Sequence, residues 1–419
     1  MKTADDRASG MPPAIFGAPR RLAWIRVLIL LEFVAILVST SAAVLIEALI
    51  YLVLLTSPDL LRRLWAIRHQ PMIRLTLAWV LVLAAGCLYT IAPREDLIDI
   101  LSSWRKLLLL PIAAACFGDP AWKRRAMITF LAVLSLLLFT SCLTWALGLQ
   151  VHRYQEQGII VANHAAQGMA FAVCLLLGLV TARENRHDRL KRCACLLASA
   201  VAFLNIAFVT PGRSGYLALM AILAAYILFS TAGAKKYRVF LLMGLAVALA
   251  LNFSPTARER IQLGLAEIQS YRDSPRLTSM GARMVAWETS LDLVRRKPLV
   301  GYGSAAYVEA YRKAVAGRSG WQGEVIEDPH NQFLRILVEH GLVGLCVFLG
   351  FIGAFFRQPA GPPFRTLGLC VLLTWCATSL FSSHFTTFLE GRFLLLWLGI
   401  FLSGSPPAPQ AAATLAAKG

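Results

Sequence analysis

Two arginines and one histidine lie at turns that border apolar stretches of the sequence. Arg213 lies in the stretch PGRSG, where the glycines on both sides allow another group to approach the backbone closely. Arg283 lies in GARMVAWETSLDL, and His330 lies in DPHNQFL, shortly before an apolar run. A guanidinium group binds phosphate oxygens through a bidentate fork and keeps its charge, whereas a neutral imidazole can act as a general base. These residue types, placed beside a membrane, indicate chemistry on a lipid-linked phosphate.

Each of the three residues also has a structural interpretation. Arg213 can be a snorkelling side chain at the membrane interface, and Arg283 can be a solvated surface arginine. His330 can cap or bridge the structure of a loop. The catalytic interpretation requires the three side chains to lie within a substrate's width of one another, on the outward side of the membrane.

The segment around Arg283 has the pattern of an amphipathic helix. Thr278 or Ser279 can cap its start, and Lys297-Pro298 ends it. Arg283 is then expected in the first turn, where a cation is mildly unfavourable against the helix dipole, so a neighbouring anion would explain it. Residues at helical spacing make one apolar face, namely Met284, Trp287, Leu291 and Val294.

The stretch 327–345 predicts a short helix before a membrane span. Asp328 is a natural N-cap and Pro329 a favoured first helical residue, which puts His330 in the first turn. Gly341 ends this helix, and the span begins after it. Because the positive end of the helix dipole disfavours imidazolium, we expect His330 to be neutral near pH 7.

The composition indicates an all-α polytopic membrane protein. Of the 419 residues, 58% are hydrophobic and only 15% are charged, whereas soluble domains average about a quarter charged residues. The net charge of +18 is spread over short clusters between apolar runs, as in cytoplasmic loops, so a nucleic-acid partner is not expected. The expected partners include membrane lipid. The nine cysteines lie in or beside apolar segments and are interpreted as small packing residues.

About twelve spans are expected from the apolar runs, with 104–117 short enough to be tilted or partly re-entrant. Basic clusters occupy alternate connections, which predicts that both termini are cytoplasmic, and Arg20 and Arg21 before the first run resemble a retained signal-anchor. The predicted spans are 22–39, 41–57, 73–92, 104–117, 127–149, 166–182, 193–209, 215–231, 238–252, 342–357, 366–380 and 391–404. The predicted organisation is a nine-helix transmembrane region (1–252), a large outward-facing helical loop (253–341), C-terminal transmembrane helices (342–404) and a disordered cytoplasmic tail (405–419).

Several further polar residues are weaker candidates for the site. Simple helix-end polarity explains most of them equally well, and the lone Gly-x-Gly turn around Tyr302 is a weak signal. Glu32 and Glu47 lie inside apolar runs, where each needs a cationic partner or a proton. The candidates for contact with donor or acceptor, or for added positive potential, are Asn163, His164, Arg105, Lys106, Tyr302, Glu390 and Arg392. The outward stretch has no cluster of metal-ligand residues, so arginines are expected to replace a metal in stabilising a diphosphate leaving group, and no cofactor is expected.

The order of these elements resembles the O-antigen ligase and polymerase superfamily of bacterial envelope glycosyltransferases. The matching stretches are PGRSGYLAL, GARMVAWETSLDLVRRKPLVGYG and HNQFLRILVEHGLVGLCVFL, within residues 205–357. The length and the single large outward loop look most like an O-antigen ligase, which transfers O-polysaccharide from undecaprenyl diphosphate to a sugar of lipid A–core. The resemblance implies a GT-C-type fold in the inner membrane and metal-independent, inverting transfer on the periplasmic side. By the same resemblance, Arg213 and Arg283 hold the diphosphate and His330 assists attack by the acceptor hydroxyl.

Two other functions remain open at this point. A polymerase of the same superfamily would use another lipid-linked glycan as acceptor. A lipid or solute transporter would explain Glu32, Glu47 and the number of spans. Transporters tend to have two related halves with polar groups at mid-membrane, whereas the polar groups here gather at one face and the halves look dissimilar.

Overall fold

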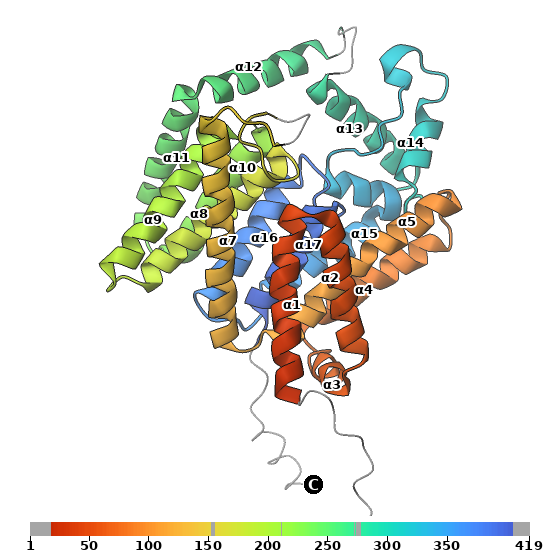
Figure 1. Cartoon of the computed structure of the whole chain (residues 1–419). Helices are drawn as coiled ribbons and strands as arrows, with labels where there is room; N and C mark the ends of the chain where they lie inside the picture. The colour runs from red at the N-terminus through yellow and green to blue at the C-terminus, as the bar shows by residue number, and fades with distance from the viewer. Residues whose placement is uncertain (1–17, 152–155, 211, 272, 274–277, 405–419) are drawn as a thin grey trace, which may run out of the picture.

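The computed structural model describes residues 18–151, 156–210, 212–271, 273 and 278–404, and within these residues it is helical without strands (Figure 1). The predicted tail at 405–419 lies outside the described residues. The longer helices are α1 (Ala18–Val38), α2 (Thr40–Leu55), α3 (Pro58–Ala66), α4 (Pro71–Cys87), α5 (Arg94–Trp104), α6 (Leu109–Cys116), α7 (Pro120–Ala146), α8 (His164–Glu184), α9 (Arg189–Leu204), α10 (Arg213–Ser230), α11 (Lys235–Phe253), α12 (Pro255–Ser270), α13 (Ser279–Arg296), α14 (Tyr307–Val315), α15 (Gln332–Phe355), α16 (Phe364–Thr378) and α17 (Phe388–Leu402). Three short helical segments lie between these helices: η1 (Arg105–Leu108) and η3 (Gly320–Gly323), which are 3₁₀ helices, and η2 (Asn205–Val209), which is a π-helix.

Local sequence signals start many of these helices. The side chains of Asp119, Asn163 and Ser254 each accept a hydrogen bond from a backbone N–H in the first turn, which satisfies a donor that the helix itself leaves unpaired. Proline occupies one of the first two positions of α3, α4, α7 and α12, where its missing N–H costs nothing.

Helix α17 lies at the centre of the apolar core. Every residue from 389 to 402 is buried, and Trp397 packs against Phe130 of α7 and Phe393 of its own helix with ring centroids 5.7 Å apart in both cases. Helix α8 is almost as deeply buried. By contrast, Val247 is the one buried residue of α11, so α11 lies at the periphery of the bundle.

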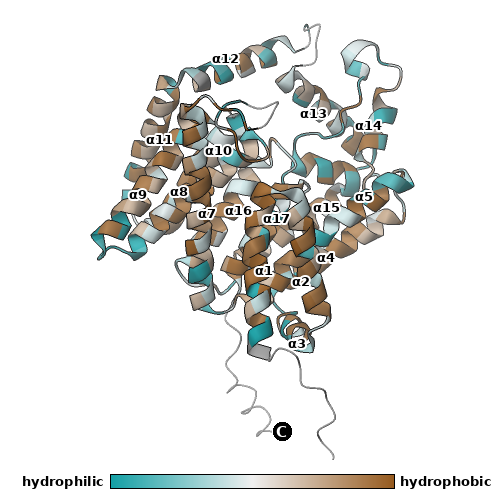
Figure 2. Ribbon diagram, viewed as in Figure 1, coloured by the Kyte–Doolittle hydropathy of each residue, from teal (hydrophilic) through white to brown (hydrophobic). Residues whose placement is uncertain are grey.

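Six helices in the described residues are long and apolar enough to cross a membrane: α7, α8, α9 continued by η2, α10, α11 and α15. A seventh results if α2 and α3 are counted as one broken span. All twelve predicted spans fall largely on helices, but the predicted number of twelve is not confirmed. Figure 2 shows apolar helices through the middle of the bundle and hydrophilic residues at its two ends.

Two of the predicted spans differ from what the sequence pattern indicates. The span predicted at 41–57 ends at Leu55, and the chain turns through 91° into α3, because a residue before proline, here Ser57, avoids the helical conformation. The short span predicted at 104–117 is the 3₁₀ turn η1 followed by the eight-residue helix α6. At 1.5 Å per residue, α6 alone is too short to cross a bilayer.

Helix α15 contains a break at Gly341, as the sequence predicts. Gly341 has φ +60°, a conformation that glycine adopts without steric cost. The N–H groups of Leu342 and Val343 donate to the carbonyls of Pro298 and Leu299 at 2.8 and 3.1 Å. The segment that follows α13 is therefore fixed against the break in α15.

The region between α11 and α15 forms a small helical layer at the end of the bundle where α10 begins. Its own core includes Val285, Leu293, Tyr307 and Tyr311. In Figure 1, α12 lies across this end of the bundle, and α13 and α14 follow beside it. This layer brings Arg283 close to the start of α10.

Candidate active site

Arg213 is the first residue of α10, and a buried polar cluster fixes the turn before it. The Thr210 hydroxyl donates to Asn205 Oδ1 at 2.8 Å and accepts from Gln167 Nε2 at 3.1 Å. A side chain at Gly168 of α8 would meet the backbone of Gly215 at 2.6 Å, so α8 and α10 approach each other closely here. These contacts hold the start of α10 in place, and Pro211 lies outside the described residues.

Arg283 lies in α13, in a helix that begins and ends as the sequence predicts. Thr278 is the N-cap and accepts from the backbone N–H of Gly281 at 3.1 Å. The helix ends at Arg296, with Lys297 as its C-cap. Arg283 is the fifth residue of this helix, one turn after Ser279.

The two guanidinium groups converge on a single hydroxyl. Arg283 Nη1 lies 3.1 Å from Ser279 Oγ, and Arg213 Nη2 lies 3.4 Å from the same oxygen. Both arginines line a cavity of about 300 Å³ together with His164, Ser214, Leu217, Ser279, Met280 and Phe381. The structure therefore brings together two of the three predicted residues, and with them the weaker candidate His164.

Each of the two arginines has one side-chain nitrogen without an acceptor among the described residues. Arg213 Nη1 and Arg283 Nε are buried, and neither has a hydrogen-bond partner among the described residues. Glu267 of α12 lies 3.8 Å from Arg213 Nη2, but the same carboxylate oxygen accepts from the backbone N–H of Met280 at 3.0 Å. Because a buried donor without an acceptor is costly, the unpaired donors indicate a site for an anion.

Burial and the neighbouring positive charge shift the pKa of Arg283 in the same direction. Burial lowers the pKa of Arg283 first, and the positive charge of Arg213 lowers it further, while Glu267 and Asp328 raise it. Since the unperturbed pKa of arginine is far above neutrality, the group remains cationic. An anion between the two arginines would relieve their repulsion.

His330 does not lie in a helix, contrary to the sequence prediction. Helix α15 begins at Gln332, and Asn331 is its N-cap, accepting from the N–H groups of Phe333 and Leu334. Asp328 instead accepts from the His330 backbone N–H at 3.0 Å and from the Ser383 hydroxyl at 2.6 Å. His330 itself has φ +51°, an uncommon conformation for a residue with a side chain. Asp328, four residues before the first residue of α15, thus stabilises a turn instead of capping the helix.

The pKa of His330 is lowered, as the sequence predicts, but for another reason. Burial is the largest cause, the charge of Arg283 adds to it, and Asp328 opposes both. The histidine precedes α15 and does not lie in its first turn. His330 does not line the arginine cavity. Trp287, one turn after Arg283, donates to the Pro329 carbonyl at 2.8 Å and so ties α13 to the histidine loop.

The remaining predicted candidates, apart from His164, lie outside the arginine cavity and make contacts within the helix bundle. Arg392 Nε and Arg105 Nε contact the two carboxylate oxygens of Glu47 at 2.8 and 3.1 Å. Lys106 is buried and donates to the carbonyls of Thr386 and Thr387. These cations thus join α2, η1 and the start of α17, and Glu47 has the cationic partners that its position requires.

The other weaker candidates are also accounted for by local contacts. Asn163 is the N-cap of α8, Glu390 Oε1 lies 4.0 Å from His384 Nδ1, and Tyr302 pairs through its backbone N–H with the Val338 carbonyl. Glu32 is buried, and neither of its carboxylate oxygens has a hydrogen-bond partner among the described residues. No group of three or more His, Cys, Asp or Glu that could hold a metal ion occurs in the part of the chain that the structure describes.

Sequence reasoning did not identify three residues that shape the site. Ser279 was expected only as a possible cap, yet its hydroxyl joins the two arginines. Glu267 and Ser383 were not singled out, because each acts from an element that is remote in sequence. Only the folded arrangement of α12 and of the loop after α16 reveals them.

The helices define a polytopic membrane protein, and the arginine cavity lies at one end of its bundle. Residues 197–349 match the family model described as O-antigen ligase, a range that contains Arg213, Arg283 and His330. The chain is 26% identical over 282 residues to an uncharacterized protein of Haemophilus influenzae, covering 64% of this chain and 69% of that protein. It is 23% identical over 215 residues to the O-antigen ligase of Escherichia coli, covering 49% of this chain and 51% of that protein. About a third of the chain is thus similar to the O-antigen ligase family.

Proposed function

We propose that the protein transfers an O-polysaccharide from undecaprenyl diphosphate to a sugar hydroxyl of lipid A–core. The observation that carries this proposal is the pair of buried arginine donors, Arg213 Nη1 and Arg283 Nε, that have no acceptor among the described residues. Two guanidinium groups side by side match the two phosphates of a diphosphate. The match of residues 197–349 to the family model described as O-antigen ligase supports a glycan transfer.

The reaction that this site favours is a single displacement. The acceptor hydroxyl oxygen attacks the anomeric carbon from the face opposite the diphosphate, so that the configuration at this carbon inverts. The bond from the anomeric carbon to the diphosphate oxygen breaks, and its electron pair leaves with the diphosphate. Arg213 and Arg283 stabilise the charge that develops there, which is the role that preorganised donors have in acyl and phosphoryl transfer. Their charges serve this purpose without a metal ion.

His330 is the proposed acceptor of the hydroxyl proton. Its pKa is lowered by burial and by Arg283, so the imidazole is neutral near pH 7, as a general base must be. The Asp328 turn holds its backbone with φ +51°. We propose that this conformation directs the imidazole toward the substrate that occupies the arginine cavity.

We further propose that the site faces the periplasm from the bacterial inner membrane, with both chain termini in the cytoplasm. Helix α8 begins beside the cavity at His164, and its other end leads into the turn around Arg183, Arg186, Arg189 and Arg192. A basic connection at the end of the bundle remote from the site agrees with the positive-inside rule.

Transfer in a purified system tests this proposal. The protein in lipid nanodiscs is given an undecaprenyl-diphosphate-linked glycan together with either lipid A–core or a second lipid-linked glycan. We expect one added chain on lipid A–core and no change of length on the polyprenyl carrier. A ladder of longer glycans on the carrier would identify a polymerase, and movement of the glycan across vesicles without acceptor would identify a transporter. Equal transfer by wild type, Arg213→Lys and His330→Ala would refute the site.

A further inference from the structure

Helix α3 has the composition and the direction of a helix at a membrane interface. It follows the apolar helix α2 after a bend of 91°, so it runs across the direction of α2. Leu60, Leu61 and Trp65 share one face of α3. Arg62 and Arg63 lie on the opposite face, and this pattern is typical of helices that lie in the plane of the interface. In Figure 1, α3 lies at the end of the bundle opposite α12.

The arginines around α3 are not neutralised by nearby acidic residues. Residues 56–75 contain four arginines but a single carboxylate, Asp59. That carboxylate lies 3.6 Å from Arg21 of α1. Among the described residues, neither Arg62 nor Arg68 has a carboxylate within ion-pair distance. The interface at this end of the bundle therefore presents positive charge that an anion can pair with.

Arg62 and Arg68 both line one apolar cavity of about 680 Å³, which we call the α3 groove. Its walls come from α3, from α4 and from the segment of η1 and α6, and apart from Thr76 and the two arginines its lining residues are apolar. On α4 the groove extends from Ile73 to Val80, which is about 10 Å at 1.5 Å per residue. This depth fits within one leaflet, since the whole hydrocarbon core is about 30 Å thick.

The Arg68 guanidinium is held with one edge free. It stacks over the Trp65 ring at 4.3 Å from the ring centroid, and its Nη1 donates to the Trp65 carbonyl at 2.9 Å. Its Nε and Nη2 have no acceptor among the described residues. These two nitrogens form the planar fork with which arginine binds two oxygens of one phosphate.

We infer that the α3 groove binds a glycerophospholipid with an anionic head group. Its phosphate pairs with Arg62 and Arg68, and its acyl chains lie along the apolar walls. The inference does not depend on the proposed function, and its support is that one cavity combines two unpaired guanidinium groups with an apolar lining. Leu77 and Leu108 line the groove and are 59% and 52% exposed, so the groove is accessible from the lipid phase.

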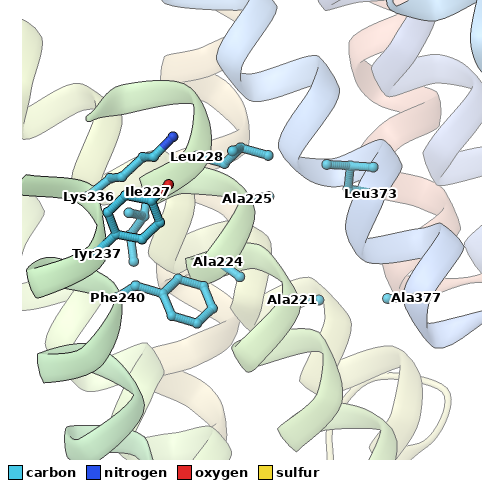
Figure 3. A pocket seen from close by; sticks show the side chains of 10 residues that line it. All are labelled: Ala221, Ala224, Ala225, Ile227, Leu228, Lys236, Tyr237, Phe240, Leu373 and Ala377. Atoms are coloured by element: carbon cyan, nitrogen blue, oxygen red, sulfur yellow. The ribbon is translucent and has the colours of Figure 1, made fainter. Parts of the chain in front are cut away.

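A second apolar cavity provides a comparison. Figure 3 shows this cavity between α10, α11 and α16, and Lys236 is its one charged lining residue. The Lys236 ammonium lies 5.1 Å from the centroid of the Tyr237 ring. A single ammonium group has no planar fork for phosphate. The charge complementarity to an anionic lipid is therefore stronger in the α3 groove.

Binding of two lipids that differ only in their head group tests the inference. Phosphatidylglycerol and phosphatidylcholine with the same acyl chains are titrated against the full-length protein in detergent micelles, with native mass spectrometry as the readout. We expect wild type to bind phosphatidylglycerol at least roughly tenfold more tightly, because the choline cation would lie beside two guanidinium groups. The double variant Arg62→Gln/Arg68→Gln should bind both lipids equally. Leu77→Trp fills the apolar part of the groove and should weaken the binding of both lipids by a similar factor.

Three matched variants provide the controls. Arg63→Gln changes the neighbouring arginine of α3, which does not line the groove, and Lys236→Gln changes the cation of the cavity in Figure 3. Both should retain the preference for phosphatidylglycerol, and Leu241→Trp, at an exposed position of α11, should bind both lipids as wild type does. The inference is refuted if the double variant retains the preference, or if Arg63→Gln or Lys236→Gln removes it as completely. It is equally refuted if Leu77→Trp binds phosphatidylglycerol as tightly as wild type, because the acyl chains would then lie outside the groove.

Discussion

Arg213 and Arg283 share one acceptor, the hydroxyl of Ser279, although α11 and α12 lie between them in the sequence. The two guanidinium groups approach this oxygen to 3.4 and 3.1 Å, and each retains a buried donor that no described residue accepts. Two like charges in such proximity repel each other, and the repulsion is relieved when an anion binds between them. The fold thus holds the two cations in position before the substrate arrives.

Replacing either arginine by lysine should reduce glycan transfer by roughly 100-fold, which is the loss seen when one donor to a developing oxyanion is removed. Arg213→Lys and Arg283→Lys keep the charge but lose the planar fork. The measurement is the initial rate of transfer to lipid A–core. Arg295→Lys is the matched control, because Arg295 lies on α13 in an exposed pair with Asp292. Unchanged rates in both site variants would exclude bidentate binding.

Gly264 of α12 offers a substitution that moves Arg213 without changing it. A Cβ at Gly264 would lie 2.3 Å from Arg213 Nη1, so Gly264→Ala must displace the guanidinium group. Because the displaced group is the end of a flexible side chain, the fold should tolerate the change, and alanine favours the helix. We expect transfer to fall roughly tenfold to 100-fold with no loss of thermal stability.

Gly353→Ala is the control for this experiment. Gly353 lies in α15, and a Cβ there would meet no atom within 4 Å. This variant should transfer glycan at the wild-type rate. If Gly264→Ala is equally active, the position of Arg213 does not limit the reaction.

The pH dependence of transfer should report the titration of His330. A base must be unprotonated, so kcat/KM should be constant at neutral pH and fall as the pH decreases through the pKa of His330. Because burial and Arg283 lower that pKa below the usual 6.5, the fall should have its midpoint below pH 6.5. A midpoint clearly above 6.5 would show that another group limits the reaction.

Asp328→Asn provides a directional test of the same residue. The negative charge of Asp328 raises the pKa of His330, so its removal should shift the acidic limb of the profile to still lower pH. The asparagine oxygen can still accept from the His330 N–H and from Ser383, so the turn should persist. Asp292→Asn, at an exposed position on α13, should leave the profile unchanged. A shift of the Asp328→Asn profile to higher pH would contradict the assignment.

The ion pair between Glu47 and Arg392 should contribute to stability rather than to chemistry. Both side chains are buried, with Glu47 1% and Arg392 2% exposed. Glu47→Gln leaves the Arg392 guanidinium without its carboxylate, which typically costs about 3 kcal/mol or more when the charge is buried. Urea unfolding in detergent micelles measures this loss, and the exposed control Asp292→Asn should cost less than about 1 kcal/mol. A wild-type unfolding free energy for Glu47→Gln would show that the pair is dispensable.

The local course of the chain is largely predictable from its sequence. Apolar runs mark the stretches that become helices, and Thr278, Gly341 and Lys297 act as start, break and end as their residue types predict. The bend between α2 and α3 was not predicted, because Asp59, Arg62 and Arg63 mark the end of the apolar run but not the direction that the chain takes after it. The start of α15 was misplaced because Asp328 and Asn331 are both good caps, and tertiary contact with Ser383 decides between them.

The site was predictable in its residue types but not in its geometry. Arginine and histidine at turns that are expected to face outward indicate a phosphate-binding role, and Arg213 and Arg283 line one cavity. The role of Ser279 as the shared acceptor depends on how α10 and α13 meet. The division of the cations into a binding pair and a structural group around Glu47 likewise depends on packing between distant helices.

A cryo-electron microscopy structure of the protein with undecaprenyl diphosphate in lipid nanodiscs tests the role of the arginine pair most directly. We expect the diphosphate between the two guanidinium groups, with phosphate oxygens roughly 3 Å from Arg213 Nη1 and Arg283 Nε, and with the His330 imidazole on the side remote from the leaving-group oxygen, where the acceptor hydroxyl attacks. A diphosphate bound elsewhere, with both arginine donors still unpaired, would show that this pair is not the donor site.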